Sequence, residues 1–363
     1  MADSVLASLS SPALALDAPA VAGEPLHPVA ERRQREAWAS AAWPAREIRI
    51  IAIPDALVTH NGLAYRADGT PVAETAIGFG DAVVHATSKD FERAWAGAER
   101  RDVDAVLCMR PGATCYGHVL AEIMPAAWLV RRLLPQVRVT LLAWTRPKLL
   151  PLYREIADAV GADGMPLANC NAPVRVRRLL VVDGFARTND YLSPHLSAFA
   201  EDVLAALGAK AAGAGRRLFL PRRPCQGRSV RNLAEVEACM RRHGFETVYP
   251  EDVPWHRQVP MFHEASHVVG VQGSALTTTM FCTAGARVLS LVPERMVDTF
   301  FWRIAGCRSL GYEEIRCRMK ESTRSRETGR LLDQDIEVDV GLLDARLSAT
   351  GAAERRCTAV MKR

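Results

Sequence analysis

Short apolar runs of strand type alternate with segments of helical periodicity along most of this 363-residue chain, and this alternation constrains the fold most strongly. From residue 104 onward, apolar runs such as 174–182 and 267–271 are separated by helical stretches of about ten residues. Strands that alternate with such helices form parallel sheets covered by helices on both faces. The sequence therefore predicts an α/β protein with two Rossmann-like domains that face a cleft.

Composition suggests where the domains begin and end. Residues 1–45 are rich in Ala and Pro and lack a sustained period, so we expect a disordered leader. The segment 210–215 contains small residues and two glycines and is the best linker candidate. We therefore expect an N-terminal domain over 46–209, a second domain over 210–320, and a C-terminal tail over 321–363 that partly returns to the body.

Three local patterns complete the N-terminal half. The apolar run 48–53 predicts a strand that ends at Pro54. Turn dipeptides at 61–62 and 68–69 predict a hairpin. Helical periodicity over 118–134 predicts one continuous helix.

Overall composition excludes several classes of protein. Hydrophobic residues make up 49% and charged residues 24%, as in soluble globular proteins, and the net charge of +5 is too small to predict nucleic-acid binding. No run approaches the roughly 20 apolar residues that cross a bilayer. The nine cysteines are an odd number without a Cys-x-x-Cys pair, which favours reduced thiols over disulfides or a zinc site. We expect a cytoplasmic protein, and peripheral attachment at the inner face of the cell membrane stays open.

The segment 268–276 carries the most informative motif. A predicted buried strand ends in a turn with two glycines, and a helix is predicted over 275–283. Glycines let the backbone approach a ligand, and a helix start offers N–H groups that suit phosphate. Ligands of open α/β sheets bind beyond the carboxyl ends of the strands. The residues of this predicted phosphate-binding turn are Gln272, Gly273, Ser274 and Ala275. A tight turn without a ligand is the alternative.

A cluster of basic residues follows the first predicted strand of the second domain. Its members are Arg222, Arg223, Arg228 and Arg231, with Asn232 beside them as a candidate helix cap. Arginine binds phosphate through two parallel hydrogen bonds, so we expect an anionic ligand here. A solvated basic loop is the alternative.

A third candidate lies at the start of the predicted helix 118–134. His118 and Glu122 stand at i and i+4, so they share one face near the helix start. A histidine or a carboxylate at such a place can act as general base, and a structural pair is the alternative. Asp102 and Asp104 have the Asp-x-Asp form of a metal site but precede a strand, so no metal is expected there.

Together these segments resemble glycosyltransferase family 61. The family's Tyr-x-His-x-x-x-Glu-x-x-Pro segment stands here as Tyr116, His118, Glu122 and Pro125. Its strand followed by Arg, a second Arg and Asn is similar to 218–220 with Arg222, Arg228 and Asn232. Its Gly-rich turn is similar to 270–278, and the resemblance extends from about residue 50 to about residue 345.

The resemblance implies a glycosyltransferase of the B type that acts in capsular or surface polysaccharide biosynthesis. It implies a nucleotide-sugar donor in the C-terminal domain, a saccharide acceptor in the N-terminal domain, and transfer with inversion and without a metal or other cofactor. Arg222, Arg228, Asn232 and the turn 272–275 would then bind the donor. Glu122 or His118 would accept the proton of the acceptor hydroxyl.

Three positions depart from the family pattern. Gln272 stands where the family usually has His, Thr278 replaces the usual Asn, and Ser290 stands where Glu is common. These departures leave an alternative open: a catalytically degenerate relative that binds nucleotide or glycan as an assembly partner. A Rossmann oxidoreductase is not expected, because no Gly-x-Gly-x-x-Gly fingerprint follows a first strand.

Overall fold

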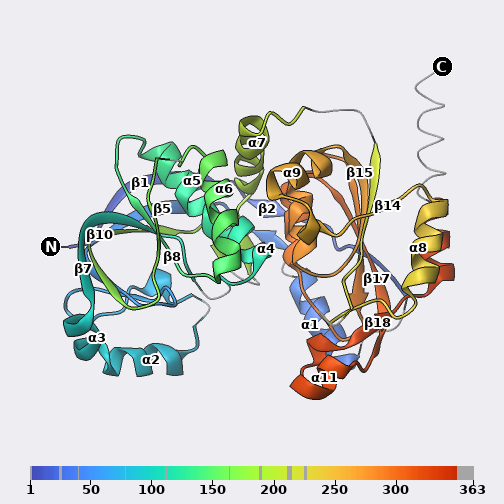
Figure 1. Ribbon diagram of the computed structural model, residues 1–363, viewed down its shortest axis with the longest axis horizontal. Helices are drawn as coiled ribbons and strands as arrows, with labels where there is room; N and C mark the ends of the chain where they lie inside the picture. Colours follow the sequence, from blue (N-terminus) through green and yellow to red (C-terminus); the bar gives the residue numbers. More distant parts are fainter. Residues whose placement is uncertain are drawn as a thin grey trace. The chain divides into compact units, whose positions relative to one another are not determined.

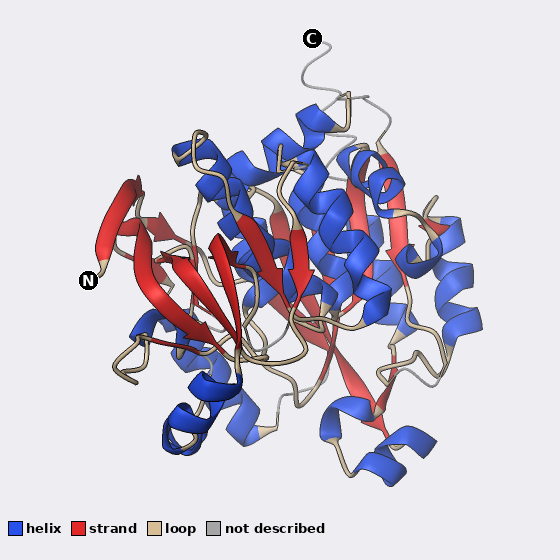
Figure 2. Ribbon diagram, turned by 60° about the vertical axis from the view of Figure 1, so that its left-hand side comes forward, coloured by secondary structure: helices blue, strands red, loops and turns tan. Residues whose placement is uncertain are grey.

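The computed structural model describes residues 2–23, 27–39, 41–77, 79–110, 113–162, 164–187, 190–210, 215–224 and 227–349 (Figures 1 and 2). Contacts between Cα atoms divide the chain into two compact units. Unit 1 comprises Met1–Ala15 and Ala42–Lys210, and unit 2 comprises Leu16–Ala41 and Ala211–Arg363. Each unit contains a sheet with flanking helices, so the predicted α/β class is confirmed (Figure 2).

The sheet of unit 1 is mixed, in contrast to the parallel sheet that was predicted. Its strand order is β1-β5-β10-β7-β8-β9, with β6 paired to β5. Strands β7, β8, β9 and β10 run parallel to their neighbours in that series, whereas β1, β6 and β10 pair antiparallel with β5. The strands are β1 (Ser4–Ser11), β5 (Arg46–Val58), β6 (Ala64–Tyr65), β7 (Glu99–Leu107), β8 (Thr140–Ala143), β9 (Leu167–Asn169) and β10 (Val174–Asp183).

Helices and short strands complete unit 1. The helices are α2 (Asp81–Lys89), α3 (Phe91–Gly97), α4 (Tyr116–His118), α5 (Met124–Leu133), α6 (Leu150–Ala159) and α7 (Leu196–Ala206), with the π-helix η2 (Val119–Ile123) and the 3-10 helices η1 (Ala73–Thr75) and η3 (Pro147–Leu149). Two short antiparallel pairs are β2 (Leu14–Ala15) with β4 (Ala42–Trp43), and β11 (Ala186–Arg187) with β12 (Tyr191–Leu192). Helix α5 packs against β7 and β10, and it buries its apolar face there.

The sheet of unit 2 has the order β14-β13-β15-β16-β17-β18, and β3 also pairs with β17. All neighbours are parallel except β18, which is antiparallel to β17. The strands are β3 (Ala20–Gly23), β13 (Arg216–Leu220), β14 (Glu246–Thr247), β15 (Ala265–Val271), β16 (Arg287–Pro293), β17 (Gly311–Lys320) and β18 (Asp335–Glu337). The order 2-1-3-4-5 for β13 to β17 is that of a doubly wound sheet, whose order reverses between β13 and β15.

The helices of unit 2 connect these strands. They are α1 (Pro28–Ala39), α8 (Leu233–Arg242), α9 (Trp255–His263), α10 (Phe300–Cys307), α11 (Thr323–Thr328), a helix over 340–349, and the 3-10 helices η4 (Pro250–Asp252), η5 (Ser274–Phe281) and η6 (Leu331–Asp333). Leu343 and Leu347 of the last helix pack with Val236 and Met240 of α8 in one buried cluster. The C-terminal segment therefore returns to unit 2.

The prediction of a disordered leader over 1–45 is wrong for the described residues. Strand β1 pairs with β5 from Ser4 to Ser11, and β3 pairs with β17 in unit 2. Buried side chains also anchor β1 and α1. Ser11 of β1 forms a hydrogen bond with Tyr191, and Gln34 of α1 donates to Glu314. The partners lie 180 and 280 residues away in sequence, so a local pattern carries no sign of them.

Two other predictions concern β5. This strand continues through Pro54 to Val58, although the sequence predicted its end at the proline. Strand β1 pairs with β5 only up to Ala52, so Pro54 lies beyond that pairing, where a residue without an N–H is tolerated better. The predicted hairpin is confirmed, because Leu57 and Val58 pair antiparallel with β6.

Candidate active site

The predicted phosphate-binding residues of unit 2 meet at the reversal of its strand order. Strand β13 ends at Leu220 and is followed by Arg222, and the neighbouring β15 ends at Val271 and is followed by Gln272. Parallel neighbours end at the same edge of a sheet, and the point where the strand order reverses leaves a crevice there. The two segments that the sequence selected therefore lie side by side.

Two arginines contact the turn 272–273. Arg228 Nη1 donates to the Gln272 carbonyl oxygen at 2.9 Å, and Arg222 Nε donates to the Gly227 carbonyl oxygen at 2.8 Å. A Cβ atom built on Gly273 would lie 2.5 Å from Arg222 Nη1, so the glycine makes room for this guanidinium group. Both side chains are half-buried. Their contacts bring two positive charges to one turn.

The backbone holds Arg228 in an uncommon conformation. Its φ of 60° lies in the left-handed region, which a side chain other than glycine rarely adopts. The Arg228 N–H donates to the Gln334 carbonyl oxygen at 2.8 Å, and residue 230 bridges to Ile336. Residues 334–336 thus fix the loop from which Arg228 reaches the turn. Strain of this kind is often found at binding sites.

The helix predicted over 275–283 is a 3-10 helix, η5. Its tighter turns begin with a hydrogen bond from the Leu276 N–H to the Gly273 carbonyl oxygen at 2.9 Å. The run of three threonines, 277–279, disfavours a regular α-helix because their β-branched side chains are restricted. The Gln272 N–H is bound to the Leu291 carbonyl oxygen, so this backbone donor is already used within the sheet.

The other members of the basic cluster turn to different partners. Arg223 forms ion pairs with Asp252 and Glu251 and stacks over the Tyr249 ring. Arg231 pairs with Asp335, with Nε at 2.9 Å from the carboxylate. The structure therefore brings Arg222 and Arg228 to the turn, and it directs Arg223 and Arg231 to carboxylates.

Asn232 serves a structural purpose in this conformation. Its Nδ2 donates to the Val338 carbonyl oxygen at 2.8 Å, and its Oδ1 accepts from the Val338 N–H at 3.1 Å. It occupies the N-cap position of α8, but its side chain makes no capping bond there, so that part of the prediction is wrong. Both polar groups of the amide are used to hold the C-terminal segment.

The three departures from the family pattern are buried. Gln272, Thr278 and Ser290 are each 0% exposed. Gln272 Nε2 donates to the Asp298 carbonyl oxygen at 3.0 Å, so this side chain ties the turn to the loop after β16. All three departures are therefore at buried positions, and Ser290 pairs with Gly270 of β15.

A buried ion pair on β17 also supports this loop. Glu314 and Arg316, whose side chains are 4% and 2% exposed, approach to 2.6 Å, and Arg316 Nη1 donates to the Met296 carbonyl oxygen. Burial raises the pKa of the Glu314 carboxyl and lowers the pKa of the Arg316 guanidinium. Burial likewise holds the pKa of Tyr312, which donates to Glu314, well above its usual value.

In unit 1 the predicted pair of His118 and Glu122 is confirmed. His118 Nδ1 and Glu122 Oε2 are 2.9 Å apart, and Arg110 Nη2 lies 3.7 Å from the same oxygen. The Glu122 side chain is 2% exposed, whereas that of His118 is 27% exposed. The buried Glu122 carboxylate therefore lies between an imidazole and a guanidinium group.

The helix that carries this pair is not regular. Residues 119–123 form one π-turn between α4 and α5, where the sequence predicted a continuous α-helix. Pro125 stands at the start of α5. In a continuous α-helix it would lack an N–H for one backbone hydrogen bond, and its ring would clash with the carbonyl of the preceding turn. The wider turn accommodates Pro125 and carries Glu122, and π-turns of this kind frequently occur at functional sites.

The Glu122 carboxylate lines a cavity of about 60 Å³ in unit 1. Arg110 and Met109 follow β7, and Asp183 and Gly184 lie at the end of β10. These residues line the same cavity. The strand order of unit 1 reverses between β7 and β10, so this is again a strand-end site. Sequence reasoning missed Arg110 and Asp183, although their position directly after apolar runs was a usable signal.

Asp102 and Asp104 are engaged by arginines. Asp104 is bound by Arg177 and Arg178, and Arg177 also lies 3.6 Å from Asp102. Both carboxylates therefore form ion pairs with arginines of β10.

The fold and its two strand-end sites define an α/β protein with an arginine-lined turn in one unit and a buried carboxylate–histidine pair in the other. Residues 116–289 match the family model of glycosyltransferase 61, a segment that includes His118, Glu122 and the turn 272–275. This similarity supports a glycosyltransferase enzyme. No curated protein matches the chain. Within the described residues, every helix is too short or too polar to span a bilayer.

Proposed function

We propose that this glycosyltransferase moves a sugar from a nucleotide-sugar donor to a saccharide acceptor, with inversion at the anomeric carbon and without a metal cofactor. The donor would bind unit 2 and the acceptor unit 1, in the B-type arrangement of two Rossmann-like halves. The proposed setting is capsular or surface polysaccharide biosynthesis in the cytoplasm, at the inner face of the cell membrane.

The convergence of Arg222 and Arg228 on the turn 272–273 is the observation that supports this proposal. Guanidinium groups recognise phosphate oxygens through paired hydrogen bonds, and backbone N–H groups add further donors. As the glycosidic bond breaks, negative charge grows on the departing diphosphate. Two fixed cations at that place would stabilise this charge, the task that a divalent metal performs in other enzymes.

The pair in unit 1 supports a proton acceptor. Hydrogen bonding of His118 Nδ1–H to the buried Glu122 carboxylate places the imidazole lone pair on Nε2. In this proposal His118 Nε2 accepts the proton of the acceptor hydroxyl as its oxygen attacks the anomeric carbon. Glu122 orients the ring and stabilises the imidazolium that forms. The greater exposure of His118 favours it over Glu122 as the base.

A ligand panel tests the donor assignment. Nucleoside diphosphates and their sugars are added to the full chain, and the melting temperature is recorded, because a ligand of the folded state raises it. We expect a rise with one nucleotide class in the wild type and its loss in Arg222→Ala and Arg228→Ala. Arg223→Ala is the matched control, since Arg223 pairs with Asp252. Unchanged donor binding and turnover in both test variants would refute the proposal.

Release of free sugar from the selected donor then tests catalysis. We expect the wild type to hydrolyse the donor slowly without an acceptor, and to transfer the sugar when the correct saccharide is present. His118→Ala and Glu122→Ala should bind the donor normally but lose transfer. Donor binding without any hydrolysis or transfer in the wild type would favour the assembly-partner alternative.

A further inference from the structure

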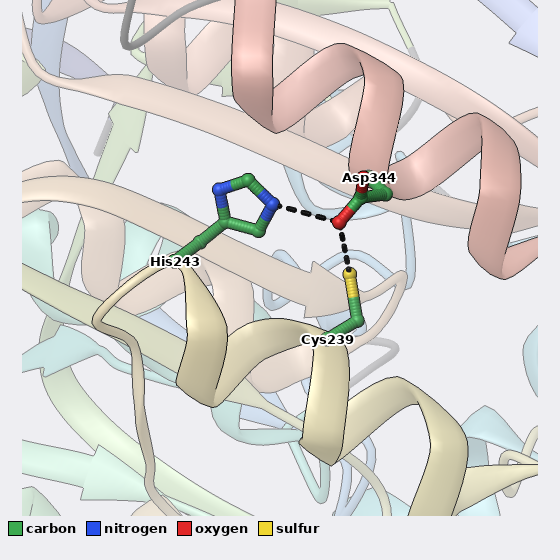
Figure 3. A group of neighbouring side chains, drawn as sticks. All are labelled: Cys239, His243 and Asp344. Carbon is green, nitrogen blue, oxygen red and sulfur yellow. Dashed lines mark hydrogen bonds and ion pairs between the residues drawn. The ribbon is translucent and has the colours of Figure 1, made fainter.

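A cysteine, a histidine and an aspartate that belong to none of the predicted motifs meet in unit 2 (Figure 3). Within the described part of the chain, Cys239, His243 and Asp344 form the one group of three potential metal ligands whose donor atoms all lie within 4.8 Å of one another. Cys239 lies in α8 and His243 is the C-cap residue of that helix, so the two stand at i and i+4 on one face. Asp344 comes from the helix 340–349 and points toward both.

We propose that Cys239, His243 and Asp344 bind a divalent transition-metal ion, with Zn²⁺ as the best chemical fit. Thiolate, imidazole and carboxylate are the three ligand types of protein zinc sites. A thiolate disfavours Mg²⁺ and Ca²⁺, which take oxygen ligands. The fourth position would be filled by water.

The distances are close to those that zinc requires. Tetrahedral geometry with ordinary zinc–ligand bonds separates the sulfur and oxygen ligands by about 3.5 Å and the nitrogen and oxygen ligands by about 3.3 Å. Here Cys239 Sγ lies 3.6 Å from Asp344 Oδ1, and His243 Nε2 lies 3.0 Å from the same oxygen. The third pair, the cysteine sulfur and the histidine nitrogen, lies within 4.8 Å.

The exposure of the three residues is graded. Cys239 is 0% exposed, whereas the side chains of His243 and Asp344 are 17% and 43% exposed. The ion would therefore enter from the Asp344 side and meet the thiol last. Arg242 Nη2, which lies 3.1 Å from Asp344 Oδ1, must move aside, and its side chain is 59% exposed and has room to do so.

Charge and protons balance at this site. Without metal, burial raises the pKa of the Cys239 thiol, and the His243 hydrogen bond lowers the pKa of Asp344. Binding of Zn²⁺ releases the thiol proton, and the resulting thiolate and the carboxylate together neutralise the ion. Metal affinity should therefore increase with pH.

The proposed ion would clamp the C-terminal helix onto α8. Asn232 at the start of α8 already holds Val338, and Leu343 and Leu347 pack against its apolar face. A metal at Cys239 and His243 would fix the other end of α8 to the same segment. Because residues 334–336 support the Arg228 loop, the clamp would stabilise that loop without taking part in sugar transfer.

Metal titration of the full chain tests this proposal. Protein stripped with a chelator is titrated with Zn²⁺ and then with Co²⁺, whose absorption reports on its ligands. We expect one equivalent to bind, a thiolate-to-cobalt charge-transfer band to appear, and the melting temperature to rise with Zn²⁺. In Cys239→Ala the band should vanish, and in Asp344→Asn the affinity should fall about tenfold or more.

Cys317→Ala is the matched control, since Cys317 belongs to the same buried cluster as Cys239. It should keep the charge-transfer band and the Zn²⁺-dependent rise in melting temperature. Asp344→Asn keeps the shape of a partly exposed side chain, so it provides a folded variant if Cys239→Ala proves unstable. Failure to retain Zn²⁺, a Co²⁺ complex without a thiolate band, or unchanged affinity in Asp344→Asn would each overturn the proposal. The metal titration contains no donor, so the metal proposal can fail while donor binding that depends on Arg222 and Arg228 is still observed.

Discussion

The strand-end sites of the two units differ in the groups that the fold buries. In unit 1 a carboxylate, Glu122, is almost completely buried and is stabilised by His118 and Arg110. In unit 2 the cations Arg222 and Arg228 are half-buried and bond to backbone carbonyl oxygens at a glycine turn. In the proposed function, burial and the π-turn fix the carboxylate that orients His118, and the two arginines at the turn would bind the donor's phosphates.

The largest effect is expected from the carboxylate of unit 1. Glu122→Gln keeps the size of the side chain but removes the charge that orients His118. We expect kcat to fall about 10²–10⁴-fold, while the affinity for the donor is unchanged. Steady-state kinetics with the donor that the ligand panel selects measure this. Glu92→Gln on the exposed face of α3 is the control, and an unaltered kcat in Glu122→Gln would show that this carboxylate does not position the base.

A smaller effect is expected from the cations of unit 2. Arg222→Lys and Arg228→Lys keep the charge but lose the paired geometry, so kcat/KM for the donor should fall about 10–10²-fold in each. The KM for the acceptor should stay constant, which separates the two sites kinetically. Arg223→Lys should behave as the wild type. An equal loss in all three variants would indicate a general charge effect.

Buried thiols distinguish the two units at alkaline pH. Burial raises the pKa of Cys108 in unit 1, and of Cys282 and Cys307 in unit 2, to about 12 in each case. Thiols of the unfolded chain ionise at about pH 8.5. The contribution of these buried thiols to the free energy of unfolding is therefore complete below that pH, and it is lost as pH rises toward 12. Each thiol contributes a slope of about 1.4 kcal/mol per pH unit in that window.

Urea unfolding at several pH values under reducing conditions measures this slope. The double variant Cys282→Ala and Cys307→Ala should flatten the pH dependence about twice as much as Cys108→Ala does. Identical slopes in the wild type and in the double variant would show that the thiols of unit 2 are not protected from ionisation.

The smallest effect concerns two asparagines with similar bonds. Asn232 in unit 2 bonds the backbone of Val338, and Asn169 in unit 1 bonds the backbone of Thr145. We expect Asn232→Ala and Asn169→Ala each to lower the free energy of unfolding by about 1–2 kcal/mol. Thermal or urea unfolding measures both. If Asn232→Ala instead raises the KM for the donor and leaves stability unchanged, Asn232 contacts the donor as the sequence predicted.

Local patterns were sufficient for the parts of each site that depend on short spacing. His118 and Glu122 are four residues apart, so helical geometry alone predicts that they meet. Gly270 and Gly273 mark a close approach of the backbone, and a Cβ on Gly270 would lie 2.8 Å from Leu276. The π-turn escaped prediction, because periodicity over 118–134 averages over a single widened turn.

Groups brought together by distant segments could not be predicted in the same way. Arg110 follows β7 and Asp183 ends β10, and these two strands are adjacent only because β10 pairs with β7. Residues 4–23 supply two strands, β1 and β3, which pair with the edges of β5 and β17. These partner strands lie far along the chain, so the N-terminal sequence alone could not predict the pairing. Asn232 had the residue type of a cap, but the return of residues 335–349 gave its amide a different partner.

The alternation of apolar runs and helical segments determined the α/β class, and the glycines and arginines near the ends of those runs determined which segments carry the candidate site. Tertiary structure decided which of those side chains face one turn, which carboxylates engage the remaining arginines, and that Cys239 and His243 meet Asp344. The physical reason is range: periodicity reflects contacts within a few residues, whereas hydrogen bonds and ion pairs between segments depend on how the sheets are ordered.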